Sequence, residues 1–450
     1  MAGLFGLSVD PKAYQGEFSE DFFWGTLYQQ HLGEEYAGIA LSKNGNIEIQ
    51  SYPGLFNSNF YNKMVTLEGT EAIGYCGSQE EPFRQKSKLG EIAACFSGNI
   101  TNCSRLMEEF FNFGHTLERG DEIEVIVKFI AQGRDTVDGI ARMSKKVEGS
   151  YALLVLGAEG MYAATFSGHW PLVIGEKKGA LAIATDPSGF DNIGFEILRD
   201  LTPGEIVLIK NGKLETKTII TPTRSKICSF LWVYTAFPTG VFRGIPVSLI
   251  RRRLGAALAA RDIKNGFIPD IVTLVPDSGR HHGIGYFEEF CRQMNEGRIK
   301  RIPIFDELLS KYPYAGRSFT PQDEKKRKKT AHFKLLKSSE KKRYQGKVVV
   351  VCDDSIVRGN QTQTNLVPKY KALGVSEIHL RISNPELHSY CPYGKTTKKG
   401  ELFSERFQTK EEKIEFLGVQ GLEYNTIDDL VRVIGLPREV LCVDCNLLQS

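Results

Sequence analysis

The residues best suited to chemistry lie in the segment 347–362, KVVVVCDDSIVRGNQT. An apolar run that predicts a buried strand ends at the acid pair Asp353 and Asp354, and a polar turn then leads into a predicted helix at 363–373. Backbone N–H groups and hydroxyls in such a turn bind phosphate, while paired carboxylates accept hydrogen bonds from vicinal hydroxyls and lie near Mg²⁺. The segment therefore predicts a ribose 5-phosphate site. Its phosphate-binding groups are Ser355, Gly359 and Thr362.

Other nucleotide chemistries lack their usual patterns. The chain contains neither GxxxxGK[ST] nor GxGxxG, so triphosphate hydrolysis and dinucleotide binding have no motif to support them. The alternative to a phosphate site is a polar strand end with a solvated turn. The order of strand, acid pair, glycine turn and helix favours the phosphate site.

Two different patterns of elements must position these residues. Up to about residue 220, short apolar stretches broken by Gly and Asn predict strands and hairpins, including a hairpin at 201–217 that turns at Asn211-Gly212. Two stretches with helical spacing lie among them and predict a layered mixture of sheet and helix. Beyond the proline-containing stretch at 220–227, the nearly continuous apolar runs are typical of parallel strands buried on both faces. Ligands of such sheets bind at the carboxyl ends of the strands.

Length and charge exclude several classes of protein. The 450 residues allow two or three domains, and 57 Lys and Arg against 54 Asp and Glu leave a net charge of only +3. The basic runs at 251–253 and 325–329 lack interleaved aromatics, so nucleic-acid binding is not expected. No long apolar run predicts a membrane span, and the N-terminus does not resemble a secretory signal. We therefore expect a cytoplasmic protein without disulfides.

The chain has nine cysteines, an odd number that does not suit a set of paired disulfides in an intracellular protein. They indicate buried thiols together with a metal cluster, and Cys442 and Cys445 form a CxxC pair.

Several motifs in order give the chain a resemblance to a known family. The segment DDSIVRG, the start Gly-Leu-Phe-Gly, Tyr234, PDSGRHHGIGY, YAGRSF and the last cysteines resemble those of the glutamine phosphoribosylpyrophosphate amidotransferases. The resemblance implies an N-terminal nucleophile-type αββα sandwich, followed by a type I phosphoribosyltransferase domain with a parallel sheet. The expected domains are a glutaminase-like one at 1–224 and a transferase at 225–450 that ends in a cluster-binding segment.

The resemblance implies displacement of pyrophosphate from phosphoribosyl pyrophosphate (PRPP) by a nitrogen nucleophile. Asp353, Asp354 and Arg317 would be catalytic, and Asp353, Asp354 and Ser278 would bind Mg²⁺. Arg251 coincides with a substrate-contacting position of the family, although the Tyr that precedes it there is Ser248 here. The expected PRPP-binding residues are Ser278, Lys311, Tyr314, Ser355, Ile356, Val357, Arg358, Gly359, Asn360, Gln361, Thr362, Arg327 and Lys334.

The resemblance also assigns four of the cysteines. Cys228, Cys391, Cys442 and Cys445 fall at the positions where the iron–sulfur type of this family binds a [4Fe–4S] cluster, which thiolates ligate well. Zinc bound by four thiolates and four unrelated buried thiols are the alternatives. The other five cysteines are interpreted as core thiols.

The glutaminase half departs from the family. The nucleophilic cysteine of the mature N-terminus is Ala2 here, and a methyl group cannot form the thioester. The arginine that binds the glutamine carboxylate is Gly77, and the Asn-Gly of the oxyanion hole is Ser97-Gly98. The family's Arg-Asp-Pro is Thr165-Phe166-Ser167, and its acid for the glutamine amino group aligns with Asp121 or Glu122. Glutaminase activity is therefore predicted to be absent.

The acceptor side has changed too, because the family's Ala-Arg-Pro-Asp-Ser is Ala236-Phe237-Pro238-Thr239-Gly240. We predict a phosphoribosyltransferase that uses ammonia, ammonia from a separate supplying protein, or another amine. The alternative is a catalytically silent paralog that binds PRPP or nucleotides and regulates or scaffolds a partner, since Asn360 and Gln361 replace two threonines of the family's loop. The resemblance suggests a homodimer or homotetramer.

Overall fold

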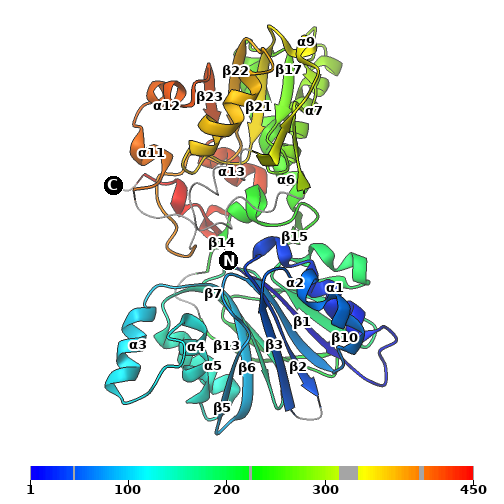
Figure 1. Ribbon diagram of the computed structural model, residues 1–450, viewed down its shortest axis with the longest axis vertical. Helices are drawn as coiled ribbons and strands as arrows, with labels where there is room; N and C mark the ends of the chain where they lie inside the picture. The colour runs from blue at the N-terminus through cyan, green and yellow to red at the C-terminus, as the bar shows by residue number, and fades with distance from the viewer. Residues whose placement is uncertain (1, 44–45, 222–224, 314–332, 395–399, 449–450) are drawn as a thin grey trace. The chain divides into compact units, whose positions relative to one another are not determined.

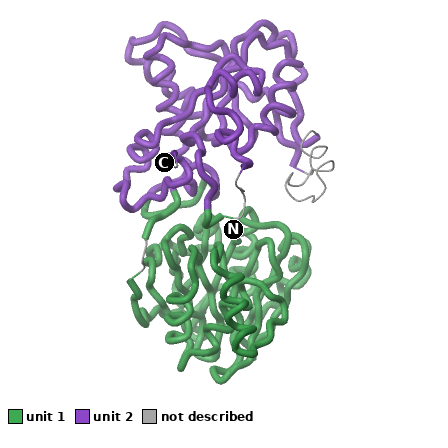
Figure 2. The backbone as a smooth tube through the Cα atoms, turned by 90° about the vertical axis from the view of Figure 1, so that its left-hand side faces the viewer, with its two compact units in different colours: residues 1–228, 237–244, 392–395 green, residues 229–236, 245–391, 396–450 purple. Residues whose placement is uncertain are grey.

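The chain is described from a computed structural model that covers residues 2–43, 46–221, 225–313, 333–394 and 400–448. It forms two compact units (Figure 2). The longest segment of unit 1 ends at Cys228, near the predicted boundary at 224. Unit 1 consists of Met1–Cys228, Phe237–Gly244 and Pro392–Lys395, and unit 2 consists of Ser229–Ala236, Ile245–Cys391 and Thr396–Ser450.

Unit 1 contains two antiparallel sheets that pack face to face (Figure 1). The seven-stranded sheet has the order β11 (Glu196–Asp200), β9 (Val173–Lys177), β10 (Ala180–Ala184), β1 (Gly3–Val9), β4 (Glu71–Gly77), β2 (Tyr36–Lys43) and β3 (Asn46–Pro53). The six-stranded sheet has the order β13 (Lys213–Ile219), β12 (Glu205–Lys210), β8 (Gly160–Phe166), β7 (Gly149–Gly157), β6 (Gly90–Ile100) and β5 (Phe83–Ser87).

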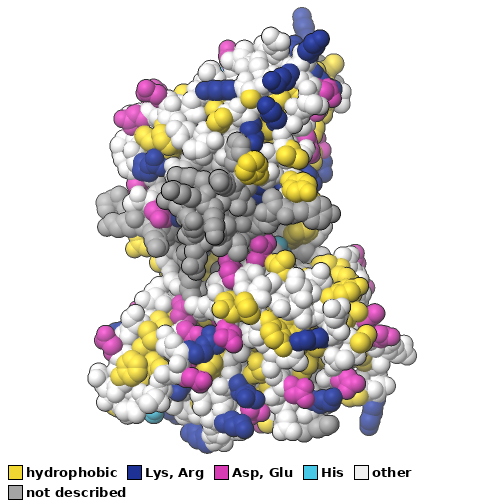
Figure 3. All heavy atoms as spheres, in the orientation of Figure 1, with side chains coloured by type: hydrophobic (Ala, Val, Ile, Leu, Met, Phe, Trp, Pro, Cys, Tyr) yellow, Lys and Arg dark blue, Asp and Glu magenta, His cyan; other side chains and the backbone are white. Residues whose placement is uncertain are grey.

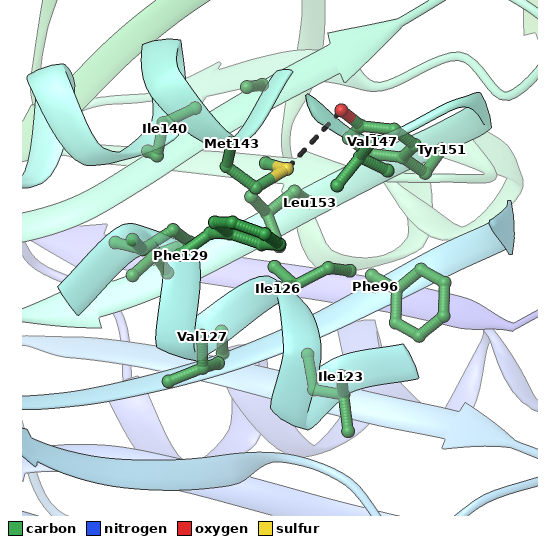
Figure 4. Close-up of a cluster of buried hydrophobic side chains, with 14 of the residues drawn as sticks. Phe96, Ile123, Ile126, Val127, Phe129, Ile140, Met143, Val147, Tyr151 and Leu153 are labelled. Atoms are coloured by element: carbon green, nitrogen blue, oxygen red, sulfur yellow. Dashed lines mark hydrogen bonds between the residues drawn. The ribbon is translucent and has the colours of Figure 1, made fainter. Parts of the chain in front are cut away.

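Helices cover the outer face of each sheet, so the predicted αββα sandwich is confirmed. Helix α1 packs on β1 and β4, and α4 packs on β5 and β6. Figure 4 shows how α4 and α5 bury Ile126, Phe129 and Met143 against the strands of the six-stranded sheet. The helices of unit 1 are α1 (Phe18–Leu27), α2 (Phe56–Phe60), α3 (Cys103–Asn112), α4 (Glu122–Ala131) and α5 (Thr136–Lys146).

The hairpin predicted from Asn211-Gly212 is confirmed. Strands β12 and β13 pair in antiparallel register up to Lys210 and Lys213. Both turn residues have positive φ, 48° for Asn211 and 64° for Gly212, as the tight turn of a twisted hairpin requires.

Unit 2 is built on a parallel sheet, as the apolar runs predicted. Side chains alternate between its faces: Val350 and Cys352 pack with α6 and α7, whereas Val349 and Val351 pack with α10 and α12. The strand order is β18 (Ile304–Phe305), β17 (Ile271–Leu274), β21 (Val348–Asp353), β22 (Glu377–Ile382) and β23 (Gly421–Tyr424). The helices are α6 (Val247–Lys264), α7 (Arg280–Asn295), α9 (Lys341–Tyr344), α10 (Val367–Lys371), α11 (Phe403–Arg406), α12 (Lys410–Leu417) and α13 (Ile427–Ile434).

Short strands complete the chain. An antiparallel ribbon of β19 (Leu309–Lys311) and β20 (Leu335–Lys337) belongs to unit 2. The remaining strands are β14 (Ile227–Cys228), β15 (Val241–Phe242), β16 (Ile245–Pro246) and β24 (Leu441–Cys442).

Charge is distributed over both units on the face that Figure 3 shows. On unit 1, Lys and Arg side chains alternate with Asp and Glu, and on unit 2 several Lys and Arg side chains lie near one another. Helix α9 contributes the exposed Lys341, Lys342 and Arg343. Among the described residues, no helix is both long enough and apolar enough to cross a membrane.

Candidate functional site

The acid pair lies at the carboxyl end of the central strand β21. Strand β21 has parallel neighbours on both sides, β17 and β22, and Asp353 is its last residue. The carbonyls of Asp353 and Asp354 accept hydrogen bonds from the backbone of Ser383 (3.0 Å) and Asn384 (2.7 Å). The fold therefore places both carboxylates at the edge of the sheet where ligands of α/β proteins bind.

Hydroxyl and amide groups orient the two carboxylates. Ser278 Oγ donates to Asp353 Oδ1 at 2.7 Å, and the backbone N–H of Asp354 donates to the same oxygen at 2.9 Å. Ser355 Oγ donates to Asp354 Oδ2 at 2.5 Å. The three predicted Mg²⁺ ligands, Asp353, Asp354 and Ser278, are thus brought together.

Burial and mutual repulsion act on this pair. The pKa of Asp353 is raised well above its usual range, first by burial and then by the neighbouring charge of Asp354. Burial also raises the pKa of Asp354, while Ser355 and the charge of Arg251 act to lower it. A divalent cation would relieve the repulsion, and carboxylate and hydroxyl oxygens are the donors it prefers. The donor set therefore fits Mg²⁺.

The turn after β17 lies beside the acid pair. Asp277 has a φ of 55°, a strained value for a residue with a side chain. Lys311 Nζ forms an ion pair with the Asp277 carboxylate. At Gly279 an added Cβ would lie 2.2 Å from the carbonyl oxygen of Cys352, so only glycine allows this turn to pack on the end of β21. The predicted pyrophosphate-side residues Ser278 and Lys311 therefore both lie close to the end of β21.

The predicted 5-phosphate loop, residues 355–362, leads into helical turns as expected. The backbone N–H of Gln363 bonds to the carbonyl of Gly359 at 3.0 Å, and π-helical η7 (Thr362–Leu366) continues into α10. Gly359 has a φ of 75°. The Ile356 side chain belongs to the hydrophobic core, so only its backbone is available to a ligand.

Two of the predicted PRPP-binding residues, Tyr314 and Arg327, and the predicted catalytic residue Arg317 lie outside the described residues. Lys334 is half-buried, and its carbonyl accepts a hydrogen bond from the backbone N–H of Tyr312 at 2.7 Å. The ribbon of β19 and β20 follows directly. The chain on both sides of 314–332 is therefore hydrogen-bonded together.

The Arg251 guanidinium donates hydrogen bonds to backbone carbonyls. Its side chain is 4% exposed, and it donates to the carbonyls of Trp232 (3.0 Å), Tyr234 (2.9 Å) and Ala236 (2.7 Å). These bonds fix the π-helical segment η5 (Leu231–Thr235), which presents the exposed Tyr234. In this structure Arg251 acts as a positioning residue, which its sequence position alone did not reveal.

Residue 2, where the nucleophile of the family is predicted to stand, is buried. Ala2 lies just before β1, is 5% exposed and packs in the core between the two sheets. Its backbone N–H donates to Ser97 Oγ at 3.0 Å. The predicted oxyanion-hole position Ser97 is thus occupied by a contact within the protein, and no nucleophilic side chain is available at residue 2.

Tyr75 fills the space beside Gly77, the residue predicted to stand in place of the family's glutamine-binding arginine. A Cβ added at Gly77 would lie 2.1 Å from the Tyr75 hydroxyl oxygen and 2.2 Å from its ring. Tyr75 is fully buried, and its hydroxyl accepts a hydrogen bond from the backbone N–H of Gln79 at 3.3 Å. A longer side chain at residue 77 would require this ring to move.

Three further residues at predicted glutaminase positions, Asp121, Glu122 and Thr165, have partners within the protein. Asp121 caps α4 by accepting from the Glu124 N–H at 3.1 Å, and it pairs with Arg119 at 2.5 Å. Glu122 accepts from the Ile100 N–H at 3.2 Å. Thr165 Oγ1 donates to the Trp170 carbonyl at 2.8 Å.

Three of the four predicted cluster ligands, Cys391, Cys442 and Cys445, belong to unit 2, and Cys228 is the last residue of a segment of unit 1. Burial, reinforced by the charges of Cys391 and Cys442, raises the pKa of Cys445 to about 12. The carbonyl of Cys445 accepts from His388 (2.8 Å) and Ser389 (3.1 Å). The described residues contain no group of three or more His, Cys, Asp or Glu side chains placed to hold a metal ion.

The other cysteines divide into two sets. Cys76, Cys95 and Cys352 are buried, as predicted for core thiols, whereas Cys103 and Cys291 are only half-buried. All nine cysteines are described, and none forms a disulfide.

Sequence reasoning missed one group beside the phosphate loop. Glu401 pairs with Arg358, and Arg406 donates to Asn360 Oδ1 at 2.8 Å. No motif marks these residues, because they lie more than 40 positions away from the loop they contact.

Comparisons with known proteins agree with this arrangement. Residues 72–192 match a glutamine amidotransferase domain model. The chain is 31% identical to an amidophosphoribosyltransferase of Methanocaldococcus jannaschii, over 99% of this chain and 96% of the relative. It is 33% identical to that of Methanothermobacter thermautotrophicus, over 95% and 90%. The structure of glutamine PRPP amidotransferase from B. subtilis, complexed with ADP and GMP, matches with a TM-score of 0.86 and 27% identity, covering 98% of this chain and 96% of that one.

These matches extend over both units and include the parallel-sheet transferase fold. The relatives carry the name of a pentosyltransferase. With this identity over nearly its full length, the chain belongs to the amidophosphoribosyltransferase family.

Proposed function

We propose that the protein binds PRPP with Mg²⁺ and transfers the phosphoribosyl group to ammonia or another amine, without glutaminase activity. The observation that carries the proposal is the contrast between the two units. Unit 2 has an oriented carboxylate pair beside two candidate phosphate loops, whereas unit 1 has a buried Ala2 at the predicted nucleophile position and Tyr75 packed beside Gly77, the predicted position of the glutamine-binding arginine.

In the reaction, the nitrogen lone pair forms a bond to C1 of the ribose while the bond from C1 to the pyrophosphate oxygen breaks. The nitrogen loses a proton, and pyrophosphate leaves. Because positive charge develops on the ribose, oriented carboxylates can stabilise the transition state. Asp353 and Asp354 would hold the ribose hydroxyls and face this charge. Mg²⁺, when bound, would neutralise charge on the pyrophosphate.

The loops would bind the two ends of the donor. Residues 355–362 would hold the 5-phosphate through backbone N–H groups and the hydroxyls of Ser355 and Thr362. Ser278 and Lys311, with Arg317 from the segment outside the described residues, would bind the pyrophosphate. Charged partners and backbone N–H groups are well suited to phosphate oxygens.

The test is pyrophosphate release from PRPP and Mg²⁺ with ammonium chloride, with glutamine, or with a panel of small amines. We expect release with ammonium or another amine and none with glutamine alone. No release with any nucleophile, although PRPP binds, would refute the transferase. Release with glutamine alone would refute the loss of glutaminase. If ammonia is delivered by a separate protein, ammonium should still support turnover at high concentration.

A catalytically silent paralog is the second candidate function. It is favoured by one observation in the phosphate loop: the side chains that replace the family's two threonines are bound within the protein. Asn360 Oδ1 accepts from Arg406, and Gln361 Oε1 accepts from Asn365 Nδ2 at 2.5 Å. Under this alternative, PRPP binds with Mg²⁺ but no nucleophile releases pyrophosphate.

For the cysteines we propose the [4Fe–4S] cluster, held by Cys228, Cys391, Cys442 and Cys445, with a structural role. Support comes from the soft thiolate ligands that these four cysteines offer and from the resemblance of their positions to those of the family's iron–sulfur type. After anaerobic purification we expect brown protein with iron and sulfide in equal amounts. Cys445→Ser should lose them, whereas Cys291→Ser should not. Zinc in place of iron, or no metal, would refute the cluster.

A further inference from the structure

The phosphate loop 355–362 is covered by a segment that lies some 45 residues further along the chain, Gly400–Phe407. The backbone N–H of Phe403 donates to the Val357 carbonyl at 2.8 Å. A Cβ at residue 359 would lie 2.9 Å from the Phe403 ring, so the ring packs directly on Gly359. Arg358 Nε bonds to Glu401 Oε2 at 3.1 Å. The covering segment thus contacts three consecutive residues of the loop.

Arg406, the last residue of α11, adds the fourth contact. One of its guanidinium nitrogens, Nη1, donates both to the Arg358 carbonyl at 3.0 Å and to Asn360 Oδ1 at 2.8 Å. The guanidinium also lies over two aromatic rings, 5.2 Å from the centroid of Phe407 and 4.9 Å from that of Phe416. Both rings belong to a cluster that packs with the core of unit 2.

These contacts fix the arginine before any ligand binds. A guanidinium stacked on aromatic rings loses less side-chain freedom when it donates hydrogen bonds than a solvated one does. Arg406 also donates to the Arg358 carbonyl, an oxygen whose partial negative charge would otherwise repel a phosphate. The positive charge of Arg406 lies at the loop as well. Backbone N–H groups of a loop bind phosphate well only when they are held in one orientation.

We propose that Arg406 is a positioning residue for the phosphate loop: through Asn360 and the Arg358 carbonyl it holds residues 358–360 ready for a ribose 5-phosphate. Asn360, which stands where the family's loop has a threonine, provides the side chain through which Arg406 reaches the loop. The inference rests on the proposed function, because it assumes that the loop binds the 5-phosphate of PRPP.

The test compares ligands that occupy different parts of the site. Binding of PRPP, ribose 5-phosphate and inorganic pyrophosphate is measured by calorimetry with Mg²⁺ for the full chain and for Arg406→Ala. In Arg406→Ala we expect the Kd of PRPP and the Kd of ribose 5-phosphate each to rise about ten-fold, which corresponds to about 1.4 kcal/mol of binding free energy. The Kd of pyrophosphate, which binds beside Ser278 and Lys311, should stay within about two-fold, which is less than about 0.5 kcal/mol.

Further variants separate positioning from general damage. Asn360→Ala removes the same contact from the loop side and should weaken ribose 5-phosphate binding similarly, and the double variant should be no weaker than Arg406→Ala. Arg406→Lys should recover part of the affinity. The control Arg301→Ala removes another exposed arginine of unit 2 that also donates to a backbone carbonyl, that of Ile268 at 2.8 Å, and should change nothing.

If the unaltered chain, Arg406→Ala and Asn360→Ala bind ribose 5-phosphate with the same Kd, the inference is wrong. Equal weakening of pyrophosphate and ribose 5-phosphate would overturn it too, because it would indicate general damage to the unit. Failure of the unaltered chain to bind PRPP at all would instead refute the proposed function, and with it the basis of the inference. The two failures are therefore distinguishable.

Discussion

At the scale of single residues, the two units differ in the reactive groups that they carry. Asp353 and Asp354 are oriented by three hydrogen bonds from Ser278, Ser355 and the backbone. In unit 1, Ala2 and Gly77 carry no group that could attack or bind glutamine. We therefore expect substitution of Asp353 to reduce transferase activity, and a cysteine at residue 2 not to produce glutaminase activity.

Replacing Asp353 by Asn should reduce pyrophosphate release by about 100-fold or more, because one of two charges facing the ribose is lost. Release is measured with PRPP, Mg²⁺ and the best nitrogen source. Asp428→Asn, at an exposed position in the first turn of α13, is the matched control and should keep full activity. Undiminished turnover in Asp353→Asn would remove this carboxylate from the mechanism, and absence of turnover in the unaltered chain would favour the silent paralog.

The same substitution should stabilise the protein at neutral pH. The pKa of Asp353 is raised in the folded state, so the folded protein holds its proton more tightly and loses stability as the pH rises through that pKa. Asn carries no charge and avoids this loss. We expect Asp353→Asn to melt at a higher temperature at neutral pH, with the difference shrinking below about pH 4, where the unfolded aspartate is also protonated. A difference independent of pH would contradict the prediction.

Restoring the nucleophile should not restore glutaminase activity. In Ala2→Cys a thiol is present, but Tyr75 still fills the space beside Gly77 and Ser97 still contacts the backbone of residue 2. We expect no glutamate release from glutamine above that of the unaltered chain, measured with a coupled assay for glutamate. Turnover in Ala2→Cys would show that the single methyl group at residue 2 is what blocks the reaction.

At the scale of elements, the hydrophobic patterns predicted most of the fold. Strand β21 is apolar from Val348 to Cys352 because both of its faces are covered, and Asn211-Gly212 predicted a hairpin turn that needs two positive φ angles. Contacts between distant segments were beyond such patterns. Arg406 reaches Asn360, 46 residues away, only because the tertiary fold brings the two segments together.

A buried ion pair joins strand β22 to helix α6 in unit 2. Arg381 on β22 donates to both oxygens of Asp262 on α6, at 2.6 and 2.9 Å, and Tyr286 of α7 also bonds to Asp262. Arg381→Met would leave Asp262 charged and buried, so we expect a loss of about 3–5 kcal/mol in the free energy of unfolding. Urea denaturation of the full chain measures this loss. Arg432→Met, which breaks the exposed pair with Asp429, should cost less than about 1 kcal/mol. Equal losses in both variants would contradict the prediction.

At the scale of the whole molecule, the two units have separate hydrophobic cores and the proposed ligand belongs to only one of them. A ligand that binds only the folded state stabilises the unit that binds it, by about 2.7 kcal/mol at a concentration 100 times its Kd. We therefore expect PRPP with Mg²⁺ to raise the melting temperature of one calorimetric transition and glutamine to raise neither. The transition that shifts can be assigned with Arg381→Met, which should lower the same one. A shift caused by glutamine would show that unit 1 still binds its family's amide substrate, whereas a PRPP shift in the transition that Arg381→Met leaves unchanged would place the donor site outside unit 2.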